Sequence, residues 1–438
     1  MKIKDDLIEK IKPYIKDYEC YLVGGYLREY FLNHGSIDRD ITIKCSNLEN
    51  LARKISDESG GSFVVLDSEN EIYRIVFGNE YIDFARLEND SLEFDTDRRD
   101  FTINSIMYDI NNDKIIDKNN GIEDIKNKII RTKNLKNLSD DPLRMLRAIR
   151  FKAETGFRVD KNITDFIKEN NKLLNNTAPE RIHQELLKIF EGEFLIDSLF
   201  LADEVKILEI IFPFFKEIKK IPKNSHHHLD LFHHSIETVK NIRINKPLLK
   251  IAAFLHDLGK PECWTIEEET NRHRFIGHDD IGSKKVIPYL KNLKFSNKEI
   301  EYISKLIKYH IYPSSLMANP DVTDRAKIRF VKKIGEDTID LIELSRADRL
   351  SARGEAVSDE MVENNLSNLD KLLNFYYEIQ PKLKTLPKLI DGNKIMELLD
   401  IKPSKKLKEI IDEINERQLE GLINTKEDAV NFVLSLKN

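Results

Sequence analysis

The segment from Tyr21 to Ile43 constrains the fold of this chain more strongly than any other part of its sequence. Its first apolar run ends at Gly24 and Gly25, and a second apolar run begins at Ile37. The first run predicts a strand that stops at a Gly-Gly turn, where backbone N–H groups can approach a phosphate without interference from a Cβ atom. The second run predicts another strand, so the segment has the size of one strand-helix-strand unit.

Two carboxylates alternate with a charged residue at the start of the second run. Side chains two apart in a strand point to the same face, so Asp38 and Asp40 are expected to lie side by side. The residues between the strands predict a helix over 26–32, which carries Arg28 and whose N-terminus favours an anion. Paired carboxylates beside an anion site are suited to a divalent metal ion. Gly-Gly alone is an ordinary turn and Asp-x-Asp alone is usually a solvated strand edge, but the ordered combination is much more specific.

A third carboxylate follows on a neighbouring strand. Apolar runs at 63–66, 72–77 and 81–85 predict three strands, and Asp83 lies in the last of them. Two metal ions share several oxygen ligands, so an acid that faces the first two across the sheet is a candidate catalytic group. The alternative is an ordinary aspartate at a strand end.

The sequence after these strands supplies cations and hydrogen-bonding groups. Arg98 and Arg99 can neutralise a triphosphate, and Asp100 and Asn104 can hydrogen-bond a ribose. The alternative is a charged loop that flanks a helix or strand.

A carboxylate and a guanidinium three residues apart, Asp141 and Arg144, can read a base. Cytosine and adenine each present an amino donor beside a ring-nitrogen acceptor, whereas uracil and guanine present the reverse, so this pair matches C and A. Arg147 and Arg150 would extend a basic stripe towards phosphates. The alternative is structural, because an acid followed by proline commonly begins a helix.

A second chemistry appears in the later half of the chain. After about residue 200 the pattern is almost entirely helical, and His256 and Asp257 are adjacent at the end of an apolar helix. A lone histidine there would most often be a packing or surface residue, but five spaced positions form a set. These positions are His234, His256 with Asp257, His278, His310 and Asp348.

The earlier motifs resemble the catalytic signature of the polymerase-β-like nucleotidyltransferases, in particular the bacterial tRNA nucleotidyltransferase and poly(A) polymerase family. The string Arg98–Asn104 matches that family's ribose and triphosphate segment almost letter for letter. Thr177–Lys188 resembles its neck, although alone it predicts a capping box that opens a helix. The resemblance implies template-independent transfer of CMP and AMP from CTP and ATP to the 3′ end of tRNA. It also implies that Asp38 and Asp40, with Asp83, hold two Mg²⁺ ions for in-line attack by the RNA 3′-hydroxyl.

The histidine and aspartate set resembles the HD superfamily of metal-dependent phosphohydrolases. An HD domain behind such a head is similar to one branch of the tRNA nucleotidyltransferases, and implies phosphatase or 2′,3′-cyclic phosphodiesterase action on RNA ends. The metal stays open among manganese, nickel, iron, zinc and magnesium. The resemblance implies the metal ligands His234, His256, Asp257 and Asp348, with His278 and His310 lining the site or holding a second ion.

The expected fold class is an α+β head with a small mixed sheet, followed by a long all-α neck, an HD domain and a tail. The 438 residues, 40% hydrophobic and 33% charged, provide core for about three domains. The predicted boundaries are a nucleotidyltransferase head over 1–135, a neck with the base-selecting helix over 136–200, an HD domain over 201–365 and a helical tail over 366–438.

Composition limits the partners and the location. A net charge of −6 means that an RNA partner needs a locally basic groove. Cys20, Cys45 and Cys263 lie far apart without a Cys-x-x-Cys pair, which argues against a disulfide framework or a thiolate zinc site. The charged start and the lack of a long apolar run predict a soluble cytoplasmic protein with no membrane partner. The oligomeric state stays open.

Three further local predictions follow from the sequence pattern. A helix is expected over Leu7–Tyr18, broken or kinked at Pro13. The chain from Ile115 to Ile125 is expected to close a hairpin and enter a helix. The run His226–His228 is expected to be a loop.

Other functions remain open at this point. The segment 84–97 is shorter than the flexible loop of most enzymes that add all three nucleotides, and resembles variants that add only the two cytidines. A poly(A) polymerase shares the head. The chain could also be a metal-dependent phosphohydrolase with an inactive head, or a non-catalytic RNA-binding protein.

Overall fold

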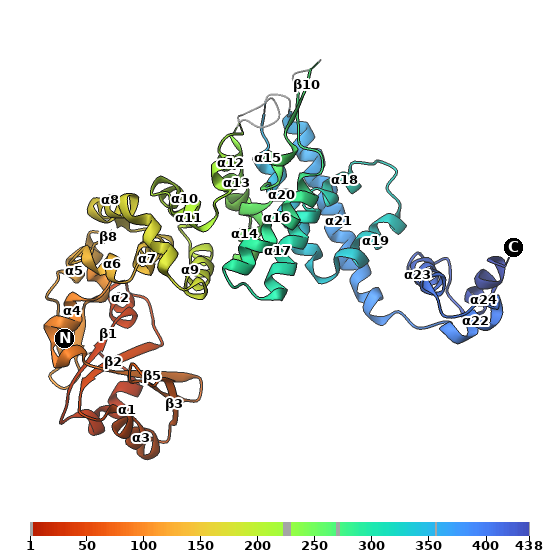
Figure 1. Cartoon of the computed structure of the whole chain (residues 1–438). Helices are drawn as coiled ribbons and strands as arrows, with labels where there is room; N and C mark the ends of the chain where they lie inside the picture. Colours follow the sequence, from red (N-terminus) through yellow and green to blue (C-terminus); the bar gives the residue numbers. More distant parts are fainter. Residues whose placement is uncertain (1–2, 222–228, 269–271, 355–356, 438) are drawn as a thin grey trace. The chain divides into compact units, whose positions relative to one another are not determined.

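The structure, a computed structural model, describes residues 3–221, 229–268, 272–354 and 357–437. The chain forms two compact units, Met1–Ile211 and Phe212–Asn438, coloured along the sequence in Figure 1. The first unit contains an α+β head and a helical neck, and the second is helical apart from one hairpin, so the predicted fold class is confirmed. The predicted start of the HD domain at residue 201 lies before the boundary between the two units. The run His226–His228 lies outside the described residues.

A seven-stranded mixed sheet forms the head, in the order β3-β4-β5-β2-β1-β6-β7. Strands β2 and β5 pair in parallel, and the other neighbours in this sheet pair antiparallel. The central strands are apolar and buried, which fixes their register against the helices that cover the sheet. The strands are β1 Glu19–Val23, β2 Asp38–Lys44, β3 Ser62–Asp67, β4 Ile72–Phe77, β5 Glu80–Arg86, β6 Met107–Asp109 and β7 Lys114–Ile116.

The head helices include the predicted helix after the Gly-Gly turn, and β7 followed by α5 confirms the predicted hairpin and helix. The prediction for α1 was wrong at its end, because the helix runs unbroken through Pro13 and stops at Ile15. Buried Ile11 and Ile15 hold the last turn against the core on both sides of the proline. The helices are α1 Asp6–Ile15, α2 Gly25–Phe31, α3 Leu48–Ser59, α4 Leu92–Asp97 and α5 Gly121–Lys126.

The neck is a small helical bundle in which α7 packs against α9 and α10. The capping box predicted at Thr177 is wrong. Helix α9 begins at Pro179 after Ala178 without a side-chain cap, since a proline at the first helical position lacks an N–H that would need one. The neck helices are α6 Lys136–Asp140, α7 Leu143–Thr155, α8 Lys161–Asn170, α9 Pro179–Glu191, α10 Leu195–Glu204 and α11 Ile207–Ile211.

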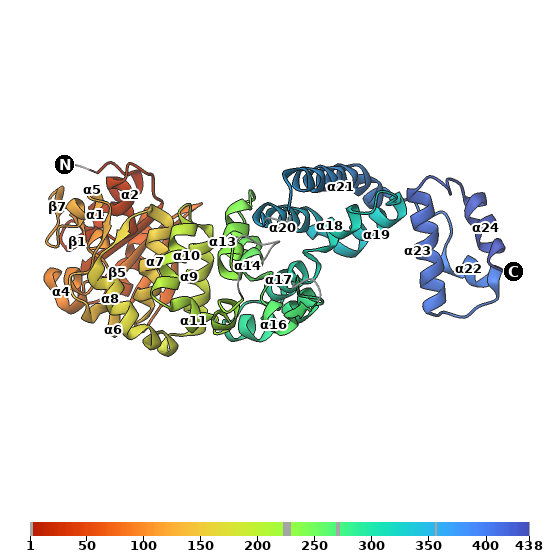
Figure 2. The same ribbon diagram turned by 90° about the horizontal axis from the view of Figure 1, so that it is seen from above.

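The second unit is built around helices α13, α14, α17 and α20, which pack against one another (Figure 2). Its first helices are α12 Phe215–Ile218, α13 Leu231–Asn241, α14 Pro247–Leu255 and α15 Lys260–Cys263. The hairpin β10 Thr265–Glu267 and β11 Arg272–Arg274 follows. The remaining helices of the bundle are α16 His278–Asn292, α17 Asn297–Tyr309, α18 Tyr312–Met317, α19 Asp324–Ile334 and α20 Thr338–Ser351.

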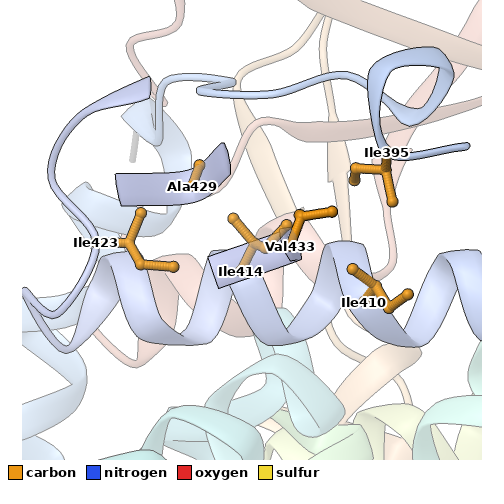
Figure 3. Close-up of a cluster of buried hydrophobic side chains, with 6 residues drawn as sticks. All are labelled: Ile395, Ile410, Ile414, Ile423, Ala429 and Val433. Carbon is orange, nitrogen blue, oxygen red and sulfur yellow. The ribbon is translucent and has the colours of Figure 1, made fainter. Parts of the chain in front are cut away.

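The C-terminal tail has a small core of its own (Figure 3). Ile395, Ile410, Ile414 and Val433 meet there from three short helices, which lets the tail bury apolar surface without the bundle. The predicted boundary at residue 366 falls inside the long helix α21, so the bundle and the tail share a continuous helix at that point. The helices are α21 Asp359–Thr385, α22 Gly392–Leu399, α23 Lys405–Leu419 and α24 Lys426–Ser435. Among the described helices, none combines the length and the apolar character needed to span a bilayer.

Candidate active sites

Three carboxylates of the head meet where β2 and β5 pair in parallel. Asp40 lies directly opposite Asp83 in the register, and Asp38 lies two residues before Asp40 on the same face. Each of the three offers a carboxylate oxygen, and these oxygens lie within 4.8 Å of one another. Such a set of hard oxygen donors fits Mg²⁺ in chemical type.

The Gly-Gly turn touches this acidic cluster. Gly24 has a φ of +75°, and a Cβ atom built on it would lie 3.0 Å from Asp40 Oδ2 and 4.0 Å from an Arg99 nitrogen. The turn therefore brings backbone, carboxylate and guanidinium together at the N-terminus of α2.

Replacing Gly24 by alanine is expected to destabilise the head by about 1–2 kcal/mol, because an L side chain is strained at this φ and its Cβ crowds Asp40. Thermal unfolding measures the effect. Gly35→Ala is the matched control, since nothing lies within 4 Å of a Cβ there. Equal melting temperatures for the two variants would contradict the strain assigned to the turn.

The pKa of Asp40 is raised to about 7. Burial is the main cause, and the negative charges of Asp38 and Asp83 add to it, while Arg99 and Arg74 oppose it. At Asp40 burial and the neighbouring carboxylates outweigh the two arginines, and a divalent ion would supply further positive charge that favours the ionised carboxylate.

Sequence reasoning missed two side chains of this cluster. Arg74 on β4 pairs with Asp83 through two hydrogen bonds of 2.6 and 2.7 Å, and its guanidinium stacks on the Tyr81 ring. The Tyr81 hydroxyl donates to Asp38 at 3.1 Å. The signal was the hairpin of β4 and β5, whose register places Arg74 opposite Asp83.

A chain of polar contacts joins α2 to the neck helix α7. Arg28 donates to Asn104 at 2.8 Å, Asn104 donates to Asp100 at 3.0 Å, and Arg147 donates to Asp100 at 2.5 and 2.9 Å. Burial alone would raise the pKa of Asp100, but the Arg147 guanidinium and the Asn104 hydrogen bond hold it below its usual range. Asp100 is therefore a buried anion that orients the residues around it.

The predicted base-reading pair Asp141 and Arg144 lines a pocket of about 260 Å³ together with Arg98 and Arg99. The predicted triphosphate residues Gly24, Gly25 and Arg28 do not line it. The Asp141 carboxylate accepts two hydrogen bonds from Arg181 of α9, at 2.8 and 3.2 Å, and Arg144 donates to the Asn137 carbonyl at 3.1 Å. Arg181 was missed because the contact joins residues 40 apart in sequence. The lining residues are Asp95, Arg98, Arg99, Asp100, Asp141, Arg144, Arg147 and Arg181.

One further residue of this pocket was missed, and one predicted residue lies outside it. Asp95, also missed, is 3% exposed and pairs with Arg99 at 2.8 Å and with Arg98 at 3.7 Å. Arg150 does not line the pocket, because its guanidinium is buried beside Glu185 at 3.3 Å. The predicted role of Arg150 on phosphates therefore has no support in this geometry.

The histidine and aspartate set converges inside the second unit. His234 comes from α13, His256 and Asp257 from the end of α14, His278 from the start of α16, His310 from the end of α17 and Asp348 from α20. His234 Nε2 lies 3.0 Å from Asp348 and 3.4 Å from Asp257. His256 Nε2 lies 3.2 Å from Asp257, and His278 Nε2 lies 3.3 Å from it. The structure thus gathers all six predicted residues.

Backbone carbonyls fix the orientation of three of these rings. The Nδ1 atoms of His256, His278 and His310 lie 2.7–2.8 Å from the carbonyls of Ala253, Phe275 and Ile307. Each contact favours the tautomer with a proton on Nδ1, so Nε2 presents its lone pair to the cluster. Metal-binding histidines use this arrangement.

The carboxylates of the cluster fit a cation as well. Asp257 is buried with the Lys260 ammonium 2.6 Å from its Oδ2 and with His256 and His278 nitrogens 3.2 and 3.3 Å away, and a divalent ion would compensate this buried charge further. The carboxylates of Asp257 and Asp348 raise the pKa of His256 to about 10 against the effect of burial. A divalent ion could replace that proton. A cleft of about 780 Å³ adjoins the cluster.

The fold and the acidic cluster define the first unit as a nucleotidyltransferase. Three known family descriptions match the chain in order: "Poly A polymerase head domain" over residues 20–131, "Probable RNA and SrmB- binding site of polymerase A" over 156–219, and "HD domain" over 224–353. The chain belongs to the tRNA nucleotidyltransferase and poly(A) polymerase family, in the form that carries an HD domain.

Curated relatives match along almost the whole chain. The A-adding tRNA nucleotidyltransferase of Deinococcus radiodurans is 28% identical, covering 94% of each chain. The CC-adding tRNA nucleotidyltransferase of Thermus thermophilus is 27% identical, covering 96% of this chain and 94% of the relative. The CCA-adding enzyme of Ligilactobacillus salivarius is 26% identical, covering 96% and 93%.

Solved structures share the fold. A CCA-adding enzyme in complex with ATP superposes with a TM-score of 0.68 at 21% identity, covering 99% of this chain and 95% of that chain. The Thermotoga maritima CCA-adding enzyme complexed with tRNA gives a TM-score of 0.64 at 22% identity, covering 99% and 94%. The fold expected from the sequence motifs is therefore confirmed along the whole chain.

Proposed function

We propose that the head transfers CMP and AMP from CTP and ATP to the 3′ end of tRNA without a template, in the cytoplasm. One observation carries the proposal: an acidic cluster on two paired strands touches a Gly-Gly turn, beside a pocket rich in arginine. The names of the full-length relatives, which add A, CC or CCA to tRNA, support the same reaction.

Different residues of the head are assigned to metal binding and to triphosphate binding. Asp38, Asp40 and Asp83 would hold Mg²⁺, which when bound activates the attacking hydroxyl and neutralises the leaving pyrophosphate. Gly24 and Gly25 expose backbone N–H groups to the triphosphate at the N-terminus of α2.

Arginine side chains are assigned to the phosphates of the nucleotide, and an Asp-Asn pair is assigned to its ribose. Arg28, Arg98 and Arg99 supply positive charge to the phosphates, and a triphosphate would have to compete with Asp95 for the two later arginines. The network of Asp100 and Asn104 would orient the ribose and hold Arg28 in place.

Base choice is assigned to Asp141 and Arg144. The carboxylate accepts from the exocyclic amino group of C or A, and the guanidinium donates to the ring nitrogen. Arg181 already donates to Asp141, which holds the carboxylate in position to share its remaining lone pairs with the base.

Replacing Asp141 by asparagine, or Arg144 by alanine, is expected to lower kcat/KM for CTP and ATP by about 10- to 100-fold, because a hydrogen bond to a charged group is lost. The ratio of CTP to UTP use should fall with it. Steady-state incorporation with each of the four nucleotides measures both effects. Lys136→Ala, an exposed change on the preceding helix, is the control, and unchanged selectivity in Asp141→Asn would contradict the assignment.

The raised pKa of Asp40 predicts a pH dependence for metal binding. A cation must displace the proton, so the apparent Mg²⁺ affinity should fall about tenfold for each pH unit below about 7 and level off above it. Incorporation at subsaturating Mg²⁺ over a pH series measures this. A flat profile between about pH 5.5 and 7 would contradict the raised pKa.

Incubation of the purified chain with truncated tRNA and CTP alone, ATP alone or both tests the main proposal, with 3′-end sequencing as the readout. Complete CCA ends with both nucleotides support it. A second candidate is addition of the two cytidines only, favoured by the compact segment between β5 and Arg98, which holds only the turn at Glu88–Asp90 and α4. Ends that stop at CC when both nucleotides are present would select that candidate.

The second unit is proposed to hydrolyse a phosphate ester at an RNA end. The convergent Nε2 atoms and buried carboxylates would hold one or two divalent ions, which when bound activate water. Lys260, 2.6 Å from Asp257, steadies that carboxylate. Release of phosphate, or opening of a 2′,3′-cyclic phosphate, tests this activity separately from incorporation.

A further inference from the structure

The cleft beside the HD cluster contains one arginine that forms no ion pair with any residue that the structure describes. Arg349 follows Asp348 on α20 and lines this cleft. Its Nε atom is buried without a hydrogen-bond partner, and its guanidinium forms no ion pair within the part of the chain that the structure describes. Leaving a guanidinium atom buried without an acceptor is unfavourable, and an anion in the cleft would relieve it.

The other lysine and arginine in the cleft lining are already paired. Lys260 Nζ lies 2.6 Å from Asp257 Oδ2, and an Arg274 nitrogen lies 2.6 Å from Glu267. Arg349 is therefore the lining cation left for a ligand. A guanidinium matches two phosphate oxygens with two parallel N–H donors, so phosphate is the anion that fits it best.

An apolar surface lies in the same cleft. Phe275 and Ile276 line it, and Ile276 is 78% exposed. A largely exposed isoleucine in this cleft gains from contact with the flat, apolar part of a ligand. The volume, about 780 Å³, lies within the range of about 300–1,000 Å³ common for small-molecule sites.

We propose that Arg349 binds the phosphate group of the substrate hydrolysed at this site, with the organic group that carries the phosphate packed against Ile276. The inference rests on the proposed hydrolase function of the second unit. In the reaction a water oxygen forms the new bond to phosphorus and the ester P–O bond breaks. One proton of the water ends on the leaving oxygen, and Arg349 neutralises the phosphate oxygens that stay charged throughout.

The sole tryptophan provides a reporter for binding that is independent of activity. Trp264 lies next to β10, and its ring centroid is 5.6 Å from that of His273, which lines the cleft. Titrating inorganic phosphate and adenosine monophosphate while following tryptophan fluorescence reads this site and not the head. Saturable changes with both ligands are expected for the unaltered chain in metal-containing buffer.

Substitutions at two residues separate the two halves of the proposal. Arg349→Gln should lower the affinity for both ligands by about tenfold or more. The affinity of Arg349→Lys should lie between those of Arg349→Gln and the unaltered chain. Ile276→Ser should lower the affinity for adenosine monophosphate by about threefold and leave the affinity for inorganic phosphate unchanged. Arg353→Gln is the matched control, because Arg353 lies four residues away and is exposed and paired with Asp359.

The outcomes distinguish this inference from the hydrolase proposal. Unchanged phosphate affinity in Arg349→Gln overturns the inference, as does a chain that shows no saturable phosphate response. If Asp257→Asn loses metal and hydrolysis while Arg349→Gln keeps its phosphate affinity, only the inference fails. If the unaltered chain binds no metal and hydrolyses nothing, the hydrolase proposal fails, and the phosphate titration still decides the role of Arg349.

Discussion

The double variant D38A/D40A is expected to lose nucleotide incorporation by a factor of at least about 10³ while it still binds tRNA. Asp38, Asp40 and Asp83 are the only three acidic side chains in the described part of the head whose oxygens lie within 4.8 Å of one another. No other cluster there can therefore bind the cation in their place. Incorporation of labelled CTP into truncated tRNA measures the loss, and a filter-binding assay measures tRNA affinity.

The same variant should also melt at a higher temperature than the unaltered chain. Because the pKa of Asp40 is raised from 3.8 to about 7 in the folded chain, the fold loses stability as the pH rises between these two values, and the full loss applies above about pH 7. Asp57→Ala, an exposed acid on α3, is the control for a general change in charge. Retained incorporation in D38A/D40A would refute the assigned roles of both residues.

The double variant H256Q/D257N is expected to lose its bound divalent metal and at least about a hundredfold of phosphate-ester hydrolysis. Six candidate metal-site residues converge in the second unit, and Asp257 lies within 3.4 Å of His234, His256 and His278, so its loss removes the centre of the set. Nucleotide incorporation should be unchanged, because the acidic cluster belongs to the other unit.

His233→Gln provides the matched control for this loss. His233 is the neighbour of His234 on α13, but its ring is half exposed and forms a hydrogen bond with the Asp230 carboxylate. Elemental analysis of each purified variant gives the metal content. Equal metal content and hydrolysis in H256Q/D257N and His233→Gln would contradict the metal site. A chain that hydrolyses esters but never incorporates a nucleotide would instead indicate an inactive head.

Strand periodicity was enough to predict the acidic cluster. Asp38 and Asp40 alternate in an apolar run, and alternation alone places both on one face, as the pairing of β2 with β5 bears out. The convergence of His256 and Asp257 with distant histidines followed from residue type and family resemblance, since sequence spacing does not reveal which helices pack together.

Contacts that depend on how the helices pack could not be predicted from the sequence. Arg181 reaches Asp141 because α9 packs against α7. Asp95 and Arg99, by contrast, form an i,i+4 pair across the end of α4, a spacing that the sequence does contain. The buried position of Arg150 likewise follows from the fit of α7 against Glu185 of α9. At Thr177 the local pattern matched a capping box, but a proline two residues later already satisfies the first turn.

Anomalous diffraction from crystals soaked with Mn²⁺ and CTP tests the central claim most directly. Manganese is expected between the carboxylates of Asp38 and Asp40, with the triphosphate within hydrogen-bonding reach of Arg99. Manganese bound only in the second unit, or CTP bound away from this acidic pair, would contradict the assignment of the head as the polymerising site.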